Sequence, residues 1–135
     1  MEKINWTNEY SVGVKALDDQ HKEIIRLINT LIEGSNDTVD SAITFNVLTE
    51  MMTYAQKHLD FEENLLEQHH YFDLMNHAAK HVRYLEKVAK FSFGTMARDE
   101  NIPKDLLEFL QNWWLHHILE EDMQYKAFFK ERGIK

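Results

Sequence analysis

The sequence predicts an all-α protein, an up-down-up-down antiparallel four-helix bundle with an extended N-terminal arm. Two features of its 135 residues indicate this class. The chain has only 1 proline and 4 glycines, so long stretches carry no helix breaker. Within those stretches, apolar residues recur every three or four positions, which is the period of one helix face. The length fits a single domain over residues 1–135.

The first 17 residues form a separate segment without a helical period. Ile4, Trp6, Val12 and Val14 are spaced loosely among polar residues, and Gly13 interrupts them. A lone strand would leave its edges unpaired, so a sheet is not expected here. We therefore expect residues 1–17 to form an extended arm whose apolar side chains cover the bundle.

Four helices are expected after the arm. Their approximate ranges are 18–33, 40–68, 73–93 and 103–131. Asp18 or Asp19 can cap the start of the first helix, which ends near Gly34, and Pro103 suits the first turn of the fourth. Because the connections are short, consecutive helices should run antiparallel.

Composition excludes several classes of function. The net charge of −8 leaves no basic patch for nucleic acid or for an anionic membrane surface. The absence of cysteine removes disulfides, thiolate chemistry and Cys-based metal sites. No signal-peptide pattern occurs, and no segment approaches the ~20 apolar residues of a membrane span. We expect a soluble, cytoplasmic and monomeric protein.

Two residue pairs in the middle of the chain are candidate metal ligands. His58 and Glu62 are four positions apart, as are His77 and His81, so each pair projects from one helix face. Both pairs fall within apolar stripes, and these side chains should therefore be buried. Buried imidazoles and carboxylates require partners, because an unpaired buried charge is costly. A metal ion would supply such partners.

The first and fourth helices add further candidates. His21 lies in the apolar stripe of the first helix, and His117 lies on the inward face of the fourth. The acid that accompanies His117 is ambiguous. Glu121 is four residues away, whereas Asp122 is five residues away and about 140° around an ideal helix. Ideal geometry favours Glu121, but a wide helix face or a one-residue bulge would bring Asp122 inward.

The inward-facing residues form one potential metal-binding set. The set comprises His21, His58, Glu62, His77, His81, His117 and one acid near 120–122. Seven ligands are too many for one zinc ion, which takes four. Magnesium and calcium prefer oxygen ligands, so five imidazoles disfavour them. Imidazoles with carboxylates suit a pair of first-row metal ions, with iron as the leading choice.

These residues fall in motifs that resemble bacterial hemerythrin over essentially the whole chain. The motifs are W…Y-S-V-G-V-x-x-L-D-x-Q-H at 6–21, H-x-x-x-E at 58–62, H-x-x-x-H at 77–81 and H-I-x-x-x-D at 117–122. The resemblance selects Asp122 as the acid on the fourth helix. It implies that His77, His81 and His117 bind one iron and that His21 and His58 bind the other. Glu62 and Asp122 would bridge the two irons, together with an oxo or hydroxo group.

The resemblance also implies a function. It predicts a non-haem di-iron protein that binds O₂ reversibly as a carrier, store or sensor, and not an enzyme. The alternative is a di-iron enzyme that reduces O₂, peroxide or nitric oxide, or an iron-handling protein. An enzyme needs a proton donor or a redox partner beside the metal. The inward stripes offer only aliphatic, aromatic and methionine neighbours, such as Ile24, Ile25, Leu59 and Leu115, which favours a carrier. The recipient of delivered O₂ is not predicted.

Overall fold

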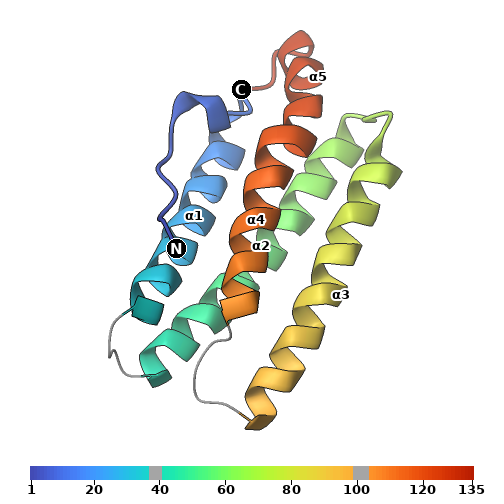
Figure 1. Ribbon diagram of the computed structural model, residues 1–135. Coiled ribbons are helices and arrows are strands. Elements are labelled where there is room, and N and C mark those ends of the chain that lie inside the picture. The colour runs from blue at the N-terminus through green and yellow to red at the C-terminus, as the bar shows by residue number, and fades with distance from the viewer. Residues whose placement is uncertain (37–40, 99–103) are drawn as a thin grey trace.

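The computed structural model describes residues 1–36, 41–98 and 104–135, and within these ranges it contains helices and no strand (Figure 1). The long helices are α1 (Lys15–Asn36), α2 (Ser41–Gln68), α3 (Leu74–Arg98) and α4 (Lys104–His116). Consecutive helices run in opposite directions, and each lies against two neighbours in the cyclic order α1, α2, α3, α4. The predicted all-α, up-down-up-down bundle is confirmed. Within the described ranges, every helix is too short or too polar to span a lipid bilayer.

The interior of the bundle consists of two apolar clusters. The larger one contains Ile24, Leu59 and Ile118, and the smaller one contains Leu17 and Leu66. Burying each such aliphatic side chain stabilises the fold by about 1.5–3 kcal/mol. On α1 the only histidine lies between Leu17 and Ile24, and on α2 the buried acid lies between Leu59 and Leu66. The polar residues of the interior therefore lie at the boundary between the two clusters.

The N-terminal arm covers the bundle as predicted. Ile4, Val12 and Val14 are buried, and the arm includes one short helical turn, η1 (Asn8–Tyr10). The Asn29 side chain fixes the start of the arm, because its Oδ1 accepts from the Ile4 N–H at 2.8 Å and its Nδ2 donates to the Ile4 carbonyl at 2.8 Å.

The first helix begins three residues earlier than predicted. We expected Asp18 or Asp19 to cap a helix starting near residue 18, but α1 begins at Lys15 and Asp18 lies within its first turn. The Asp18 carboxylate accepts hydrogen bonds from the Ser11 hydroxyl at 2.6 Å and from the Val12 N–H at 2.8 Å. Asp18 therefore anchors the arm, which ends at residue 14 instead of 17.

Two helices are longer than predicted at their C-terminal ends. α1 continues through Gly34 to Asn36, and α3 continues through Gly94 to Arg98, although we expected ends near 33 and 93. A glycine inside a helix costs only about 1 kcal/mol, which neighbouring turns can offset. The expected start of the second helix at Asp40 and the expected role of Pro103 lie outside the described residues.

The turn between α2 and α3 contains a strained residue. His70 has φ +57°, the left-handed conformation that glycine usually provides after a helix. The His70 N–H donates to the Glu67 carbonyl and the Tyr71 N–H donates to the Leu66 carbonyl, both at 3.0 Å. These bonds occupy the carbonyls of two of the last three residues of α2, so the turn is held even without glycine.

Candidate metal centre

The predicted continuous helix over 103–131 is wrong, and its interruption shapes the centre. After α4 the chain forms a π-helical turn η2 (His117–Glu121), a 3₁₀ turn η3 (Asp122–Tyr125) and a short helix α5 (Lys126–Glu131). The Asp122 N–H donates to the His117 carbonyl five residues earlier. A π turn holds one residue more than an α turn, so it returns Asp122 to the inward side. Asp122 is fully buried, whereas Glu121 is partly exposed.

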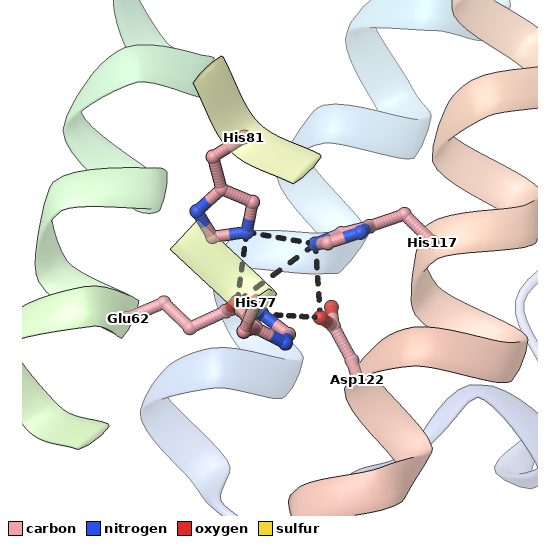
Figure 2. Close-up of side chains that lie close together, drawn as sticks. All are labelled: Glu62, His77, His81, His117 and Asp122. Atoms are coloured by element: carbon pink, nitrogen blue, oxygen red, sulfur yellow. Dashed lines mark hydrogen bonds and ion pairs between the residues drawn. The ribbon is translucent and has the colours of Figure 1, made fainter. Parts of the chain in front are cut away.

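All seven predicted residues come together in the centre of the bundle. Each is at most 4% exposed, and together they come from α1, α2, α3 and the two turns after α4. They are His21, His58, Glu62, His77, His81, His117 and Asp122. Figure 2 shows five of these side chains, which point toward one another from three parts of the bundle.

Three histidines gather on one side of the two acids. We call His77, His81 and His117, with the acid oxygens facing them, the three-His half. The Nε2 atoms of His81 and His117 are 2.9 Å apart, and His77 Nε2 lies 2.5 Å from Glu62 Oε1 (Figure 2). Asp122 Oδ1 lies 3.0 Å from His117 Nε2. One potential ligand atom from each of the five residues lies within 4.8 Å of all the others.

Two histidines gather on the other side of the same acids, and we call them, with the facing oxygens, the two-His half. The Nε2 atoms of His21 and His58 are 3.1 Å apart. Glu62 Oε2 lies 3.3 Å from His58 Nε2, and Asp122 Oδ2 lies 3.1 Å from His21 Nε2. Glu62 and Asp122 thus each present one oxygen to each half.

The outer ring nitrogens of three histidines face side-chain oxygen atoms. The Nδ1–acceptor pairs are His58–Gln20 at 2.6 Å, His81–Glu63 at 3.1 Å and His117–Glu121 at 2.6 Å. Histidines that bind a metal ion usually donate from the outer ring nitrogen to such an acceptor. His21 departs from this pattern, because its buried Nδ1 has no hydrogen-bond partner among the described residues.

The orientation of these groups fits metal ions. A hydrogen on Nδ1 of His81 and His117 leaves a lone pair on each Nε2, and two lone pairs at 2.9 Å repel each other unless a cation lies beside them. Both oxygens of Asp122 are buried and lie 3.0–3.1 Å from imidazole nitrogens, but neither forms an aligned hydrogen bond within the described chain. Leaving a buried carboxylate unsatisfied costs several kcal/mol. Two cations, one in each half, would satisfy all of these atoms.

The same geometry governs protonation of the metal-free chain. Burial opposes charging of His21 and His77, but the adjacent Asp122 and Glu62 outweigh burial and raise the pKa of both histidines to about 9. Burial lowers the pKa of His58 below its usual range. Burial and Glu62 oppose ionisation of Asp122, yet the neighbouring histidines hold its pKa well below its usual range. The acids therefore remain anionic, as metal ligands must be.

One residue of the centre was missed by the sequence reasoning. The hydroxyl of the fully buried Tyr125 donates to Glu62 Oε2 at 3.1 Å. The expectation that only groups without a transferable proton surround the centre is therefore wrong. Burial and the nearby Asp122 and Glu62 raise the pKa of Tyr125 well above its usual range. The sequence offered one indication of this residue, because Tyr125 follows Asp122 by three positions, which is about one helical turn.

The centre contains five buried imidazoles and two carboxylates that both halves share, and it lies inside a four-helix bundle. This arrangement is that of a non-haem metal-binding protein with two adjacent ion positions. Residues 12–129 match the family described as Hemerythrin HHE cation binding domain. The chain belongs to the hemerythrin family. Proteins of this family bind O₂ at a di-iron centre, so the predicted cofactor, a pair of iron ions, agrees with the donor set.

Relatives and solved structures agree with this family. The chain is 28% identical over 125 residues to bacteriohemerythrin of Pseudomonas paraeruginosa, covering 93% of this chain and 80% of that protein. It is 26% identical to bacteriohemerythrin of Clostridium acetobutylicum, covering 89% and 96% of the two chains. A crystal structure of a hemerythrin that carries a single leucine substitution superposes with a TM-score of 0.86 at 25% identity, covering 94% of this chain and 97% of the other.

Proposed function

We propose that this chain binds O₂ reversibly at a di-iron centre and acts as a carrier, store or sensor of O₂. His77, His81 and His117 would hold one iron, and His21 and His58 would hold the other. Glu62 and Asp122 would bridge the pair, which is supported by the division of their oxygens between the two halves. A cytoplasmic location and a monomeric state are part of this proposal.

The unequal number of histidines is the observation that carries the proposal. Among the described residues, no further histidine, aspartate or glutamate joins the group of His21, His58, Glu62 and Asp122. The two-His half therefore offers one ligand fewer than the three-His half and leaves room for a small molecule. The chemistry that a reduced iron pair would supply there is a reversible transfer of electrons to O₂.

Apolar packing around the two-His half supports reversible binding. Ile24, Leu59 and Trp114 are at most 1% exposed, and the Trp114 ring lies 5.8 Å from the His58 ring, measured between centroids. These side chains exclude water and cannot deliver a proton. Keeping protons and water away from bound O₂ slows irreversible oxidation of the centre.

A di-iron enzyme that reduces O₂, peroxide or nitric oxide is the second candidate, and Tyr125 is the observation that favours it. A buried phenol beside a proposed bridging acid is a potential general acid. However, this hydroxyl already donates to Glu62, and its raised pKa makes it a weak acid. We therefore prefer the carrier.

The test is to cycle the reduced, iron-loaded protein between air and argon while recording its charge-transfer absorption. Recovery of the colourless form over several cycles is expected for a carrier. Rapid loss of the reduced form with stoichiometric formation of peroxide or water would contradict it. Tyr125→Phe is the matched variant: a carrier should still cycle, whereas an enzyme that uses this phenol should lose turnover.

A further inference from the structure

We infer that small ligands reach the two-His half through a groove between α2 and α3, and that Tyr84 and Trp114 close its inner end. The inference rests on the proposed function. The groove has a volume of about 340 Å³. It is lined by Met52, Thr53 and Gln56 from α2 and by Tyr84, Val88 and Ala89 from α3.

The groove lies close to the metal centre along both helices. Gln56 precedes His58 by two residues on α2, and Tyr84 follows His81 by three residues on α3. The antiparallel direction of α2 and α3 places both segments on the same side of the centre (Figure 1). The groove is therefore separated from the centre by about one helical turn.

Two aromatic side chains separate the groove from His58. Tyr84 lines the groove but is only 1% exposed, so it forms the closed inner end. Trp114 lies behind it, and the Trp114 Nε1–H donates to the Tyr84 hydroxyl oxygen at 3.2 Å. The Trp114 ring then contacts the His58 ring, with centroids 5.8 Å apart. The path from solvent to the two-His half passes these two rings in sequence.

The chemistry of this path suits a small neutral molecule. The seven residues of the centre are at most 4% exposed, so any ligand must enter past side chains that move. The single hydrogen bond between Trp114 and Tyr84 is neutral and lies at the long end of the normal range. Met52 and Val88 provide apolar walls that do not retain a diatomic molecule. A brief separation of the two rings would open the path.

Kinetics can distinguish a residue that controls ligand entry from a residue that strengthens ligand binding. A residue on the entry path affects the barrier that the ligand crosses in both directions. Its substitution therefore changes the association and dissociation rate constants by the same factor and leaves their ratio, the equilibrium affinity, unchanged. A residue that contacts the bound ligand would change this ratio.

The experiment measures both rate constants by rapid mixing, for O₂ with the reduced protein and, with the oxidised protein at mildly acidic pH, for azide, which crosses an apolar path as neutral hydrazoic acid. Thr53→Trp places a large ring on the exposed rim of the groove and should lower both rate constants by about tenfold, equivalent to about 1.4 kcal/mol. Thr49→Trp is the matched control, because Thr49 is exposed one turn earlier on α2 and does not line the groove. It should leave both constants unchanged.

Tyr84→Phe tests the inner end by removing the hydrogen bond. Both rate constants should rise by about fivefold, the factor expected for the loss of one neutral hydrogen bond. Unchanged rates in Thr53→Trp, or a changed affinity in either variant, would overturn the inference. Because Thr53 is exposed, its variant remains informative if Tyr84→Phe does not fold. Azide binding reports access even if O₂ binding proves irreversible, so failure of the proposed function is distinguishable from failure of this path.

Discussion

The two halves of the centre use the same kinds of side chain but differ in what supports them. In the three-His half, carboxylates of Glu63 and Glu121 accept from the outer nitrogens of two histidines. In the two-His half, His58 has only the neutral amide of Gln20, and the outer nitrogen of His21 has no partner among the described residues. A carboxylate acceptor raises the basicity of a histidine ligand and fixes its orientation.

Under the proposed function, this difference suits the two halves to different tasks. The three-His half has more ligands and stronger outer support, so it should hold its metal ion more tightly. The two-His half has fewer ligands and weaker support, which suits a position that accepts and releases a small molecule. The unequal outer support thus agrees with the unequal number of histidines.

Removing a shared acid should have the largest effect. Asp122→Ala should abolish the spectrum of the paired iron centre, because Asp122 offers an oxygen to each half. Glu121→Ala should preserve the spectrum at saturating iron, since Glu121 contacts only the outer nitrogen of His117 within the buried set. Its iron affinity should fall by about 10- to 100-fold. If Glu121→Ala abolished the spectrum and Asp122→Ala did not, the assignment of the acids would be reversed.

The pH dependence of the metal-free protein should be the next largest effect. His21 and His77, one from each half, have pKa values raised to about 9 from the ordinary 6.5. These two histidines stabilise the fold in their charged form. Their contribution to the free energy of unfolding is complete below pH 6.5 and is lost as the pH rises through 9. Urea unfolding of the metal-free protein should therefore show a lower free energy of unfolding at about pH 9.5 than at about pH 6.5.

The iron-loaded protein is the control for this pH effect. Metal binding holds the histidines neutral at both pH values, so the loss between them should be small. An equal loss in both forms would show that groups outside the centre cause it.

Exchanging the outer acceptors should have a smaller effect and test the comparison itself. Glu63→Gln replaces a carboxylate by an amide beside His81, and Gln20→Glu makes the reverse change beside His58. Iron release to a chelator should occur in two phases in the unaltered protein. Glu63→Gln should speed the slow phase by about tenfold, and Gln20→Glu should slow the fast phase. Identical effects on both phases would mean that the halves do not differ in support.

The smallest effect should come from a position outside both halves. His70→Gly relieves the left-handed conformation at φ +57° and should stabilise the protein by about 0.5–1 kcal/mol. Gly133→Ala is the matched reverse change, because Gly133 has φ +70° and open space where the added methyl group would lie. It should destabilise by a similar amount, and neither change should alter iron content. Thermal unfolding and elemental analysis measure both effects.

The fold class followed from periodicity and the scarcity of helix breakers, because these reflect local physics. The five-residue spacing of His117 and Asp122 left the acid on the fourth helix open, because ideal geometry favoured Glu121; the resemblance selected Asp122, and the structure turns it inward through the π turn η2. The early start of α1 could not be foreseen, since it depends on the use of Asp18 by the arm, a tertiary contact. Asp18 offered the same capping signal whether it lay before the helix or inside it.

The outer acceptors show the same limit within the centre. Glu121 could be connected to His117 by its four-residue spacing. Gln20 and Glu63 act on histidines of other helices, 38 and 18 residues away in sequence, so their pairing depends on how the helices pack. Tyr125 was missed for a similar reason, since its hydroxyl reaches Glu62 on α2 across the bundle.

The most direct test of two unequal iron positions is the Mössbauer spectrum of the oxidised, iron-loaded protein with azide bound. If azide binds only in the two-His half, the two irons have different ligand sets. The spectrum should then contain two quadrupole doublets of equal area, with two irons per chain by elemental analysis. A single doublet, or one iron per chain, would contradict the account.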